Sequence, residues 1–160
     1  IKFVDSYRNL TRVAPPVKRA FYFRELAERV ISLTKEQALV SGAECIYIEK
    51  SDDILLYADE GQITQILINL VKNAIQAEAR HIEITAEINL SEHVIINVTN
   101  DGSPISKESQ EEIFVPFYTT KQEGTGIGLS LSRQIMRLHN GTLSLTRSDE
   151  TSMVFTLTFR

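Results

Sequence analysis

Three glycines stand at alternate positions in the stretch GTGIGLSLS, residues 124 to 132. Gly124, Gly126 and Gly128 lose backbone entropy on folding and bury no side chain, so packing gives no reason for them. Without a Cβ they let a ligand approach the main chain, and at a helix start the free N–H groups and the dipole attract an anion. The spacing indicates a polyphosphate site, although a plain glycine-rich turn gives the same pattern. It is not a P-loop, because no Lys-Ser/Thr pair follows the last glycine.

A second set of polar side chains follows one stripe of the helix expected after Asp59: Asn69, Asn73 and Gln76. Asn73 falls at the edge of the apolar face beside Ile66, where an exposed helix more often carries Lys or Glu. A neutral amide oxygen can ligate a hard cation that already holds phosphate oxygens and water, which is how Mg²⁺ is usually bound. The stripe favours a magnesium-binding role. For a single asparagine, an amide satisfied by a neighbouring backbone group is the alternative.

A third candidate, TNDGSPI at residues 99 to 105, lies at the end of a predicted strand. Gly102 would let a flat ring lie against the chain, and the side chain of Asn100 or Asp101 could accept a hydrogen bond from an exocyclic amine. An ordinary turn is the alternative, because Asn-Asp-Gly is common in turns.

A fourth candidate is EEIFVPFYTTK, residues 111 to 121, where two phenylalanines flank a proline inside a polar loop. A loop that covers a small hydrophobic cluster would have the same composition. Thr119, Thr120 and Lys121 place hydroxyls and a cation close to the glycines, so this segment is a candidate for a mobile phosphate clasp.

The clearest of the elements that must position these residues is the helix after Asp59, which is capped by Asp59 with Gln62 three residues on. Its apolar stripe is Ile63, Ile66, Leu67, Leu70, Val71, Ala74 and Ile75. Helical periodicity also predicts helices over residues 1–13, 25–35 and 126–139, with Pro15-Pro16 ending the first and Gly42 breaking the second near its end.

Strand patterns predict three hairpins: residues 44–50 with 54–58, 81–88 with 93–99, and 142–146 with 154–159. Strands and helices do not alternate regularly, so we expect an α/β (α+β) two-layer fold. Its sheet would be mixed and mostly antiparallel, with helices covering one face. The long, partly regular stretch from Asn100 to Glu123 is expected to be a functional lid.

Composition describes one globular domain of 160 residues, 42% hydrophobic and 24% charged. No apolar run approaches the roughly 20 residues that cross a bilayer. A net charge of −4 argues against a nucleic-acid partner, and the single Cys45 makes an intrachain disulfide impossible. We therefore expect a cytoplasmic domain. Because the chain starts at Ile1 and not at Met, we also expect a fragment of a longer protein, whose membrane anchoring stays open.

Taken in the order in which they occur along the chain, the four candidates resemble the N box, first glycine box, F box and second glycine box of the GHKL superfamily. The match is to the catalytic and ATP-binding domain of sensor histidine kinases, in two-component systems. QILINLVKNAIQA resembles the N box, IFVPFYTTK the F box and GTGIGLSLSRQIMRLHNG the second glycine box. SYRNLTRVAPP resembles the end of the second helix of a dimerisation and phosphotransfer domain. The resemblance therefore divides the chain into a helical remnant, residues 1–14, and a catalytic ATP-binding domain, residues 15–160.

The resemblance implies a Bergerat-type sandwich that binds ATP through Mg²⁺, with Asn73 as the magnesium ligand. The nucleotide contacts that it implies are Asn69, Asn73, Gln76, Asn100, Gly102, Ile105, Thr119, Thr120, Lys121, Gly124, Thr125, Gly126, Ile127, Gly128 and Leu129.

The chain departs from the family pattern at several positions. Asn100 stands where an aspartate usually accepts the adenine amino proton, and Pro104 replaces the second glycine of that box. Gln76 stands where many kinases carry a phosphate-binding lysine, and Ser152-Met153 where relatives often show Gly-Thr. These departures keep open a degenerate module that senses nucleotide without kinase activity.

The resemblance also bears on the type of activity. ATP-hydrolysing relatives carry a general-base glutamate one turn before the magnesium asparagine, and here that position is Asn69, which cannot take a proton at neutral pH. A GHKL ATPase is therefore disfavoured, and we expect a protein-histidine kinase domain that is not competent alone. His81, His93 and His139 are expected to be ordinary surface histidines, so no catalytic residue is assigned within the chain and the phosphoacceptor would lie upstream of Ile1. The implied partners are the phosphotransfer domain of the same protein, in a homodimeric parent, and a response regulator.

Overall fold

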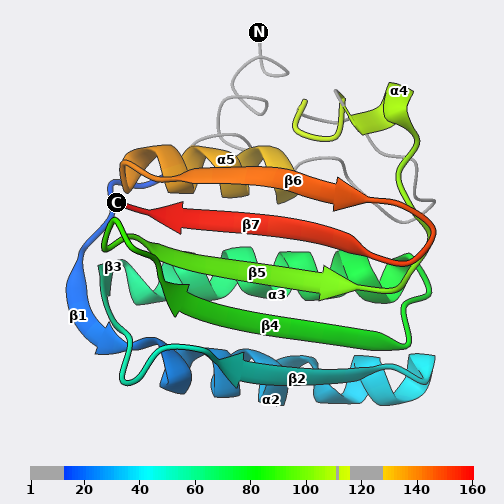
Figure 1. Cartoon of the computed structure of the whole chain (residues 1–160), viewed down its shortest axis with the longest axis horizontal. Coiled ribbons are helices and arrows are strands. Elements are labelled where there is room, and N and C mark those ends of the chain that lie inside the picture. Colours follow the sequence, from blue (N-terminus) through cyan, green and yellow to red (C-terminus); the bar gives the residue numbers. More distant parts are fainter. Residues whose placement is uncertain (1–12, 111, 116–127) are drawn as a thin grey trace, which may run out of the picture.

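The main sheet of the domain has five strands in the order β2-β4-β5-β7-β6, within the residues that the computed structural model describes: 13–110, 112–115 and 128–160 (Figure 1). β2 and β4 are parallel, and every other neighbouring pair is antiparallel. The expected mixed, mostly antiparallel sheet is confirmed. The strands are β2 (Glu44–Glu49), β4 (His81–Ile88), β5 (Val94–Asn100), β6 (Thr142–Ser148) and β7 (Met153–Phe159).

Helices α2 (Phe23–Ser41), α3 (Glu60–Gln76) and α5 (Gly128–Leu138) lie on one face of this sheet, behind it in Figure 1. α3 contacts both of the other helices as well as β5. It begins where the sequence predicts, because the Asp59 Oδ1 accepts a hydrogen bond of 3.1 Å from the amide of Gln62. Its buried residues are Ile63, Ile66, Leu67, Leu70, Val71 and Ala74. The N-box helix is thus the central helix of the domain.

A smaller, two-stranded sheet pairs β1 (Arg19–Tyr22) with β3 (Leu55–Ala58). The predicted hairpin between residues 44–50 and 54–58 is therefore wrong, although both strands form. A turn does follow β2, with Asp53 at a φ of 48°, but the chain leaves it into a different sheet. β2 instead pairs with β4 and contacts α2. Turn residues show where the chain reverses, but here they do not show which strand becomes the partner.

The other two predicted hairpins are confirmed as β4–β5 and β6–β7. α2 is longer than the periodicity indicates, and it ends as expected at Gly42, whose φ of 74° is left-handed. In the predicted lid, the structure describes a short helix α4 (Lys107–Gln110) and the buried side chain of Ile113. The predicted first helix lies outside the described residues, apart from its last residue.

Candidate functional site

The N-box asparagines of α3 lie beside the start of α5. Asn69 and Asn73 are half-buried, and Gln76 is exposed. The carboxamide of Asn69 lies so close to Gly128 that a Cβ on this glycine would come within 2.2 Å of Oδ1 and 2.7 Å of Cγ. Real Cβ atoms do not approach other atoms so closely, so a bare backbone at Gly128 is what lets the two helices meet here. The structure thus brings together one residue from each of two predicted boxes.

The amide nitrogen of Asn69 has an unsatisfied hydrogen-bonding capacity. Its Nδ2 is buried and has no hydrogen-bond partner among the described residues. Leaving a buried donor unpaired costs about 1–3 kcal/mol, so such a group is usually paired with something. The donor lies next to the N-terminal residue of α5, where helix N–H groups favour an anion. A phosphate oxygen is an anionic hydrogen-bond acceptor, so it suits both the unpaired amide donor and the helix N terminus.

The loop after β5 is packed against the end of α3. Asn100 is only 3% exposed, and its Oδ1 accepts a hydrogen bond of 2.8 Å from the amide of Gly102. A Cβ on Gly102 would lie 2.7 Å from the carbonyl oxygen of Ala77, which also accepts a 2.9 Å bond from the Ser103 amide. Ala77 caps α3 one turn after Asn73. Asn73 and the first glycine box are therefore held in one local structure.

The carboxylate of Asp101 is turned toward the start of β4. Its Oδ1 accepts hydrogen bonds from the backbone amides of Arg80, at 2.8 Å, and His81, at 3.0 Å. These bonds, that from His81 first, lower the pKa of Asp101 against a smaller opposing effect of desolvation. The sequence proposed Asn100 or Asp101 as the acceptor for an exocyclic amine. Of these two residues, Asn100 is the buried one and lies beside Gly102.

Ser148 at the end of β6 anchors the residue after Pro104. Its hydroxyl accepts a hydrogen bond of 2.9 Å from the amide of Ile105, which packs partly buried against the core. Sequence reasoning missed Ser148, because nothing local distinguishes this serine from an ordinary strand residue. The main chain of the first glycine box is thereby fixed from two sides, by α3 and by β6.

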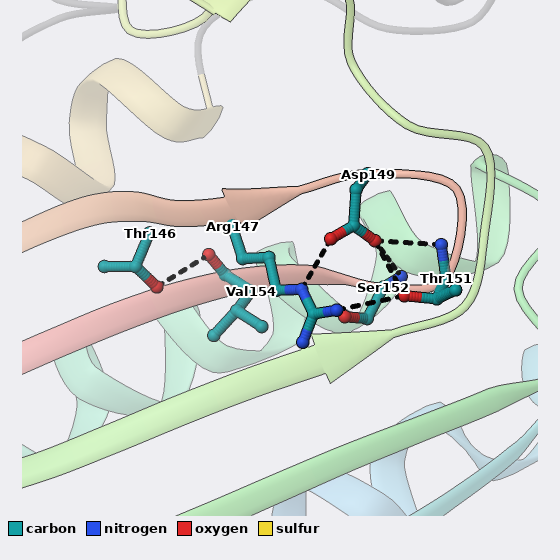
Figure 2. A network of polar contacts seen from close by, with 6 residues as sticks. All are labelled: Thr146, Arg147, Asp149, Thr151, Ser152 and Val154. Atoms are coloured by element: carbon teal, nitrogen blue, oxygen red, sulfur yellow. Dashed lines mark hydrogen bonds and ion pairs between the residues drawn. The ribbon is translucent and has the colours of Figure 1, made fainter.

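The β6–β7 turn beside this box is built around one carboxylate (Figure 2). Asp149 accepts bonds from the Arg147 guanidinium, at 2.6 Å, from both the amide and hydroxyl of Thr151, and from the amide of Ser152. These bonds, that from Arg147 first, hold the pKa of Asp149 far below its usual range. The next residue, Met153, is buried and pairs directly with Asn100 across β5 and β7. This position next to Asn100 thus carries an apolar side chain that is buried in the core.

The described part of the F box is attached to α5. Ile113 is buried, and the Arg133 guanidinium lies 3.8 Å from the centroid of the Phe114 ring. Burial first, and then the neighbouring Arg137, lower the pKa of Arg133. Sequence reasoning missed Arg133, because no local pattern relates it to Phe114, which lies 19 positions earlier in the chain. The predicted residues Thr119, Thr120, Lys121, Gly124, Thr125, Gly126 and Ile127 lie outside the described residues.

The two remaining predicted residues lie at the margins of this site. Gln76 lines a groove of about 410 Å³ between α2 and α3, together with Lys72. Leu129 is half-buried and packs against the core. A larger cavity of about 600 Å³ lies between α2 and the starts of β2 and β4, and none of the predicted site residues lines it. Burial raises the pKa of Cys45 in its wall to about 11.

His139 is not the surface histidine that the sequence predicts. It is 7% exposed, and each ring nitrogen lies within hydrogen-bonding distance of a backbone atom. His81 is exposed and His93 half-buried. The end of a helix is usually solvent-facing, but here it packs against Phe159 of β7, with ring centroids 6.4 Å apart.

Residues 58–160 match the family described as "Histidine kinase-, DNA gyrase B-, and HSP90-like ATPase". The chain belongs to this family. The matched region contains α3, β4 to β7 and α5, and thus every described residue of the candidate site. The resemblance of the four sequence boxes to this family is confirmed.

Similar proteins within this family include bacterial kinases. The chain is 39% identical over 158 residues to the sensor histidine kinase ZraS of Salmonella typhi, which covers 98% of this chain and 34% of that protein. It is 32% identical over 136 residues to sporulation kinase C of Bacillus subtilis, which covers 82% of this chain and 31% of that protein. The chain thus spans about a third of the length of these curated relatives.

Solved structures with the same fold include the catalytic domain of histidine kinase ThkA. That domain has a TM-score of 0.79 and 35% identity, with 89% of this chain and 94% of that chain covered. ThkA in complex with response regulator protein TrrA has the same TM-score at 30% identity, with 99% of this chain and 46% of that chain covered. The chain therefore has the fold of a histidine kinase catalytic domain. No helix in its described part has the length and apolar character needed to span a membrane.

Proposed function

We propose that this chain binds ATP with Mg²⁺ and presents the γ-phosphate to a histidine on another domain of a sensor histidine kinase. The observation that carries the proposal is the meeting of Asn69 with Gly128. A buried amide donor without a described partner lies against a helix start that has no Cβ. The family and the ThkA fold support the same reading.

The described residues at the centre of the site have proposed roles. The main chain at Gly128 and the amide of Asn69 hold phosphate oxygens, and the carboxamide oxygen of Asn73, a half-buried residue, ligates the metal. Mg²⁺, when bound, would neutralise phosphate charge. Asn100 accepts a hydrogen bond from the adenine amine, because a carbonyl oxygen can still accept through a second lone pair while it holds the Gly102 amide. Gly102 and Ile105 form the wall against which the base lies.

Transfer rather than hydrolysis is the better reading of this site. Phosphoryl transfer asks the protein mainly for positioning and charge neutralisation, so a domain without its own base can serve a nucleophile from elsewhere. Hydrolysis needs a group that orients and deprotonates water, and the carboxamide of Asn69 cannot take that proton. His139 is committed to two backbone contacts, which argues against it as the acceptor.

The proposed partners follow from the same family membership. The acceptor histidine would belong to a dimerisation and phosphotransfer domain of the parent, for which residues 1–14 are proposed as the end of the second helix. A response regulator would receive the phosphate, as supported by the ThkA relative whose structure contains one. We place the domain in the cytoplasm, where ATP is available.

Calorimetry of the chain with ATP and Mg²⁺ tests the binding step. Asn73→Ala should weaken ATP binding about tenfold or more and abolish its dependence on Mg²⁺. Gln65→Ala, on an exposed face of the same helix, is the matched control and should bind as the wild type does. An Asn73→Ala chain that keeps full magnesium-dependent affinity would contradict the metal assignment.

Labelled ATP tests the transfer step. Label should pass to a separately supplied phosphotransfer domain of the parent and should not remain on this chain alone. Steady hydrolysis by the chain alone would instead favour an ATPase. Asn100→Asp addresses the degenerate alternative, since a large gain in ATP affinity would indicate that the natural site is impaired for adenine.

A further inference from the structure

His139 forms a buried cross-link between the two helices of the nucleotide site. Its Nε2 lies 3.0 Å from the backbone nitrogen of Asp59, and its Nδ1 lies 2.8 Å from the carbonyl oxygen of Ile135. An amide N–H can only donate and a carbonyl can only accept. Nε2 must therefore be the unprotonated acceptor, while Nδ1–H donates within the last turn of α5. The imidazole is thus held in one tautomer, with both nitrogens paired.

The contact with Asp59 lies at the opposite end of the α3–α5 interface from the nucleotide site. Asp59 precedes the first residue of α3 and His139 follows the last residue of α5, whereas Asn69 meets Gly128 at the first residue of α5. The two helices are therefore antiparallel. Asp59 and Asn69 are ten residues apart, which corresponds to about 15 Å along a helix, and Gly128 to Leu138 spans the same length.

These two contacts help to position α5 on α3, besides the packing of Ile135 and Met136 in the core. The bond from the Asp59 amide to His139 adds a directional contact at the end of α5 away from Gly128, because Asp59 is itself fixed as the N-cap of α3 through Gln62. The Phe159 ring of β7 packs against the same imidazole at an interplanar angle of 85°. The last turn of α5 is thus attached to both the N-box helix and the sheet.

We propose that His139 is a positioning residue for phosphate binding, which acts by accepting the Asp59 amide and so keeps the start of α5 against Asn69. This inference rests on the proposed function. The adenine side of the site is proposed at Asn100 and Gly102, whose closest contacts among the described residues are with each other and with Ala77 at the end of α3, and not with α5. Loss of the cross-link should therefore weaken the hold on phosphates and spare the hold on the base.

Two substitutions at His139 distinguish the contributions of its two ring nitrogens. The amide of a glutamine reaches about as far as Nε2, so His139→Gln keeps an acceptor for Asp59. The amide of an asparagine reaches only about as far as Nδ1, so His139→Asn keeps the bond to Ile135 and loses the acceptor. His93→Asn, at a half-buried histidine just before β5, is the matched control. Affinities for adenosine and for magnesium-ATP would be measured by NMR titration of each chain.

We expect His139→Asn to weaken magnesium-ATP binding about five- to tenfold, the size of one lost hydrogen bond, while adenosine affinity changes less than about twofold. His139→Gln and His93→Asn should bind both ligands as the wild type does. The inference is overturned if His139→Asn binds magnesium-ATP normally, if it loses both ligands by the same factor, or if His139→Gln is equally impaired. A wild-type chain that binds no magnesium-ATP would instead remove the proposed function and this inference with it.

A measurement on the wild type covers the case in which His139→Asn does not fold. Coupling between two sites is reciprocal, so phosphate binding must strengthen the Asp59–His139 bond if that bond favours phosphate binding. Magnesium-ATP should therefore slow hydrogen exchange of the Asp59 amide severalfold more than adenosine does. Equal protection by both ligands would overturn the inference.

Discussion

Replacing Gly128 by alanine tests the contact on which the proposed site depends. The new Cβ would lie 2.2 Å from Oδ1, 2.7 Å from Cγ and 2.8 Å from Nδ2 of Asn69, so the asparagine or α5 must move. Overpacking of this kind costs about 1–3 kcal/mol, against a gain of about 0.5–1 kcal/mol for alanine over glycine in a helix. We expect Gly128→Ala to lower the free energy of unfolding by about 1–2 kcal/mol and to weaken magnesium-ATP binding strongly.

Gly61→Ala is the matched control, since Gly61 is also in the first turn of a helix. Its Cβ would lie 3.5 Å from the Asp59 Oδ1, an ordinary contact, so this change should stabilise the domain by about 0.4–1 kcal/mol. Adding Asn69→Ala to Gly128→Ala should restore much of the lost stability, because the clashing carboxamide is gone, without restoring ATP binding. Denaturant unfolding and calorimetry measure the two properties separately. If Gly128→Ala alone were as stable as the wild type and bound ATP normally, the close packing of α3 on α5 would be refuted.

Three further changes test the supports of the site. Gly102→Ala should destabilise the domain by about 1–3 kcal/mol in urea unfolding, because its Cβ would lie 2.7 Å from the backbone oxygen of Ala77; an unchanged midpoint would show that the loop can yield. A double-mutant cycle of Phe114→Leu with Arg133→Met should give a coupling energy of about 0.5–1 kcal/mol, and additivity would argue against the cation–π contact. Asp59→Asn keeps one side-chain oxygen, so only one of the two hydrogen bonds from the Gln62 and Val17 amides can be accepted. The change should lower the free energy of unfolding by about 1 kcal/mol at pH 7. Desolvation raises the pKa of Asp59, but these amide bonds outweigh it and the folded-state pKa is lowered. The difference in the free energy of unfolding between Asp59→Asn and the wild type should therefore be fully present above the unfolded-state pKa of about 3.9. It should disappear as pH falls through the lower folded-state pKa of Asp59; a difference independent of pH would contradict this.

Local patterns predicted the elements of the site well. The apolar stripe and the Asp59 cap predicted α3, and alternation predicted the β4–β5 and β6–β7 hairpins. The reason is physical, since caps, helical faces and hairpins are all made by residues near one another in the chain. The meeting of Asn69 with Gly128 was expected only through the resemblance, because no periodicity relates two helices that are separated along the chain by β4, β5 and α4.

The features that sequence reasoning missed are non-local. The β2–β4 pairing, the Ser148 bond to Ile105 and the burial of His139 each join segments that a window of ten or twenty residues does not contain. His139 is the clearest example. Helical periodicity placed it correctly at the end of α5, but its burial depends on Asp59 and Phe159, which are supplied by other parts of the chain.

The parallel pairing of β2 with β4 has a consequence for how the domain assembles. The two strands are separated along the chain by β3 and all of α3, so their alignment closes a long loop before any ladder bond forms. Closing such a loop loses chain entropy that a tight hairpin does not, and distant pairings form slowly. We expect β4 to pair early with β5, and β2 to join this edge only after the central helix has docked. In native exchange measurements, the backbone amides of β2 should accordingly open at lower free energy than those of β5 in the middle of the sheet.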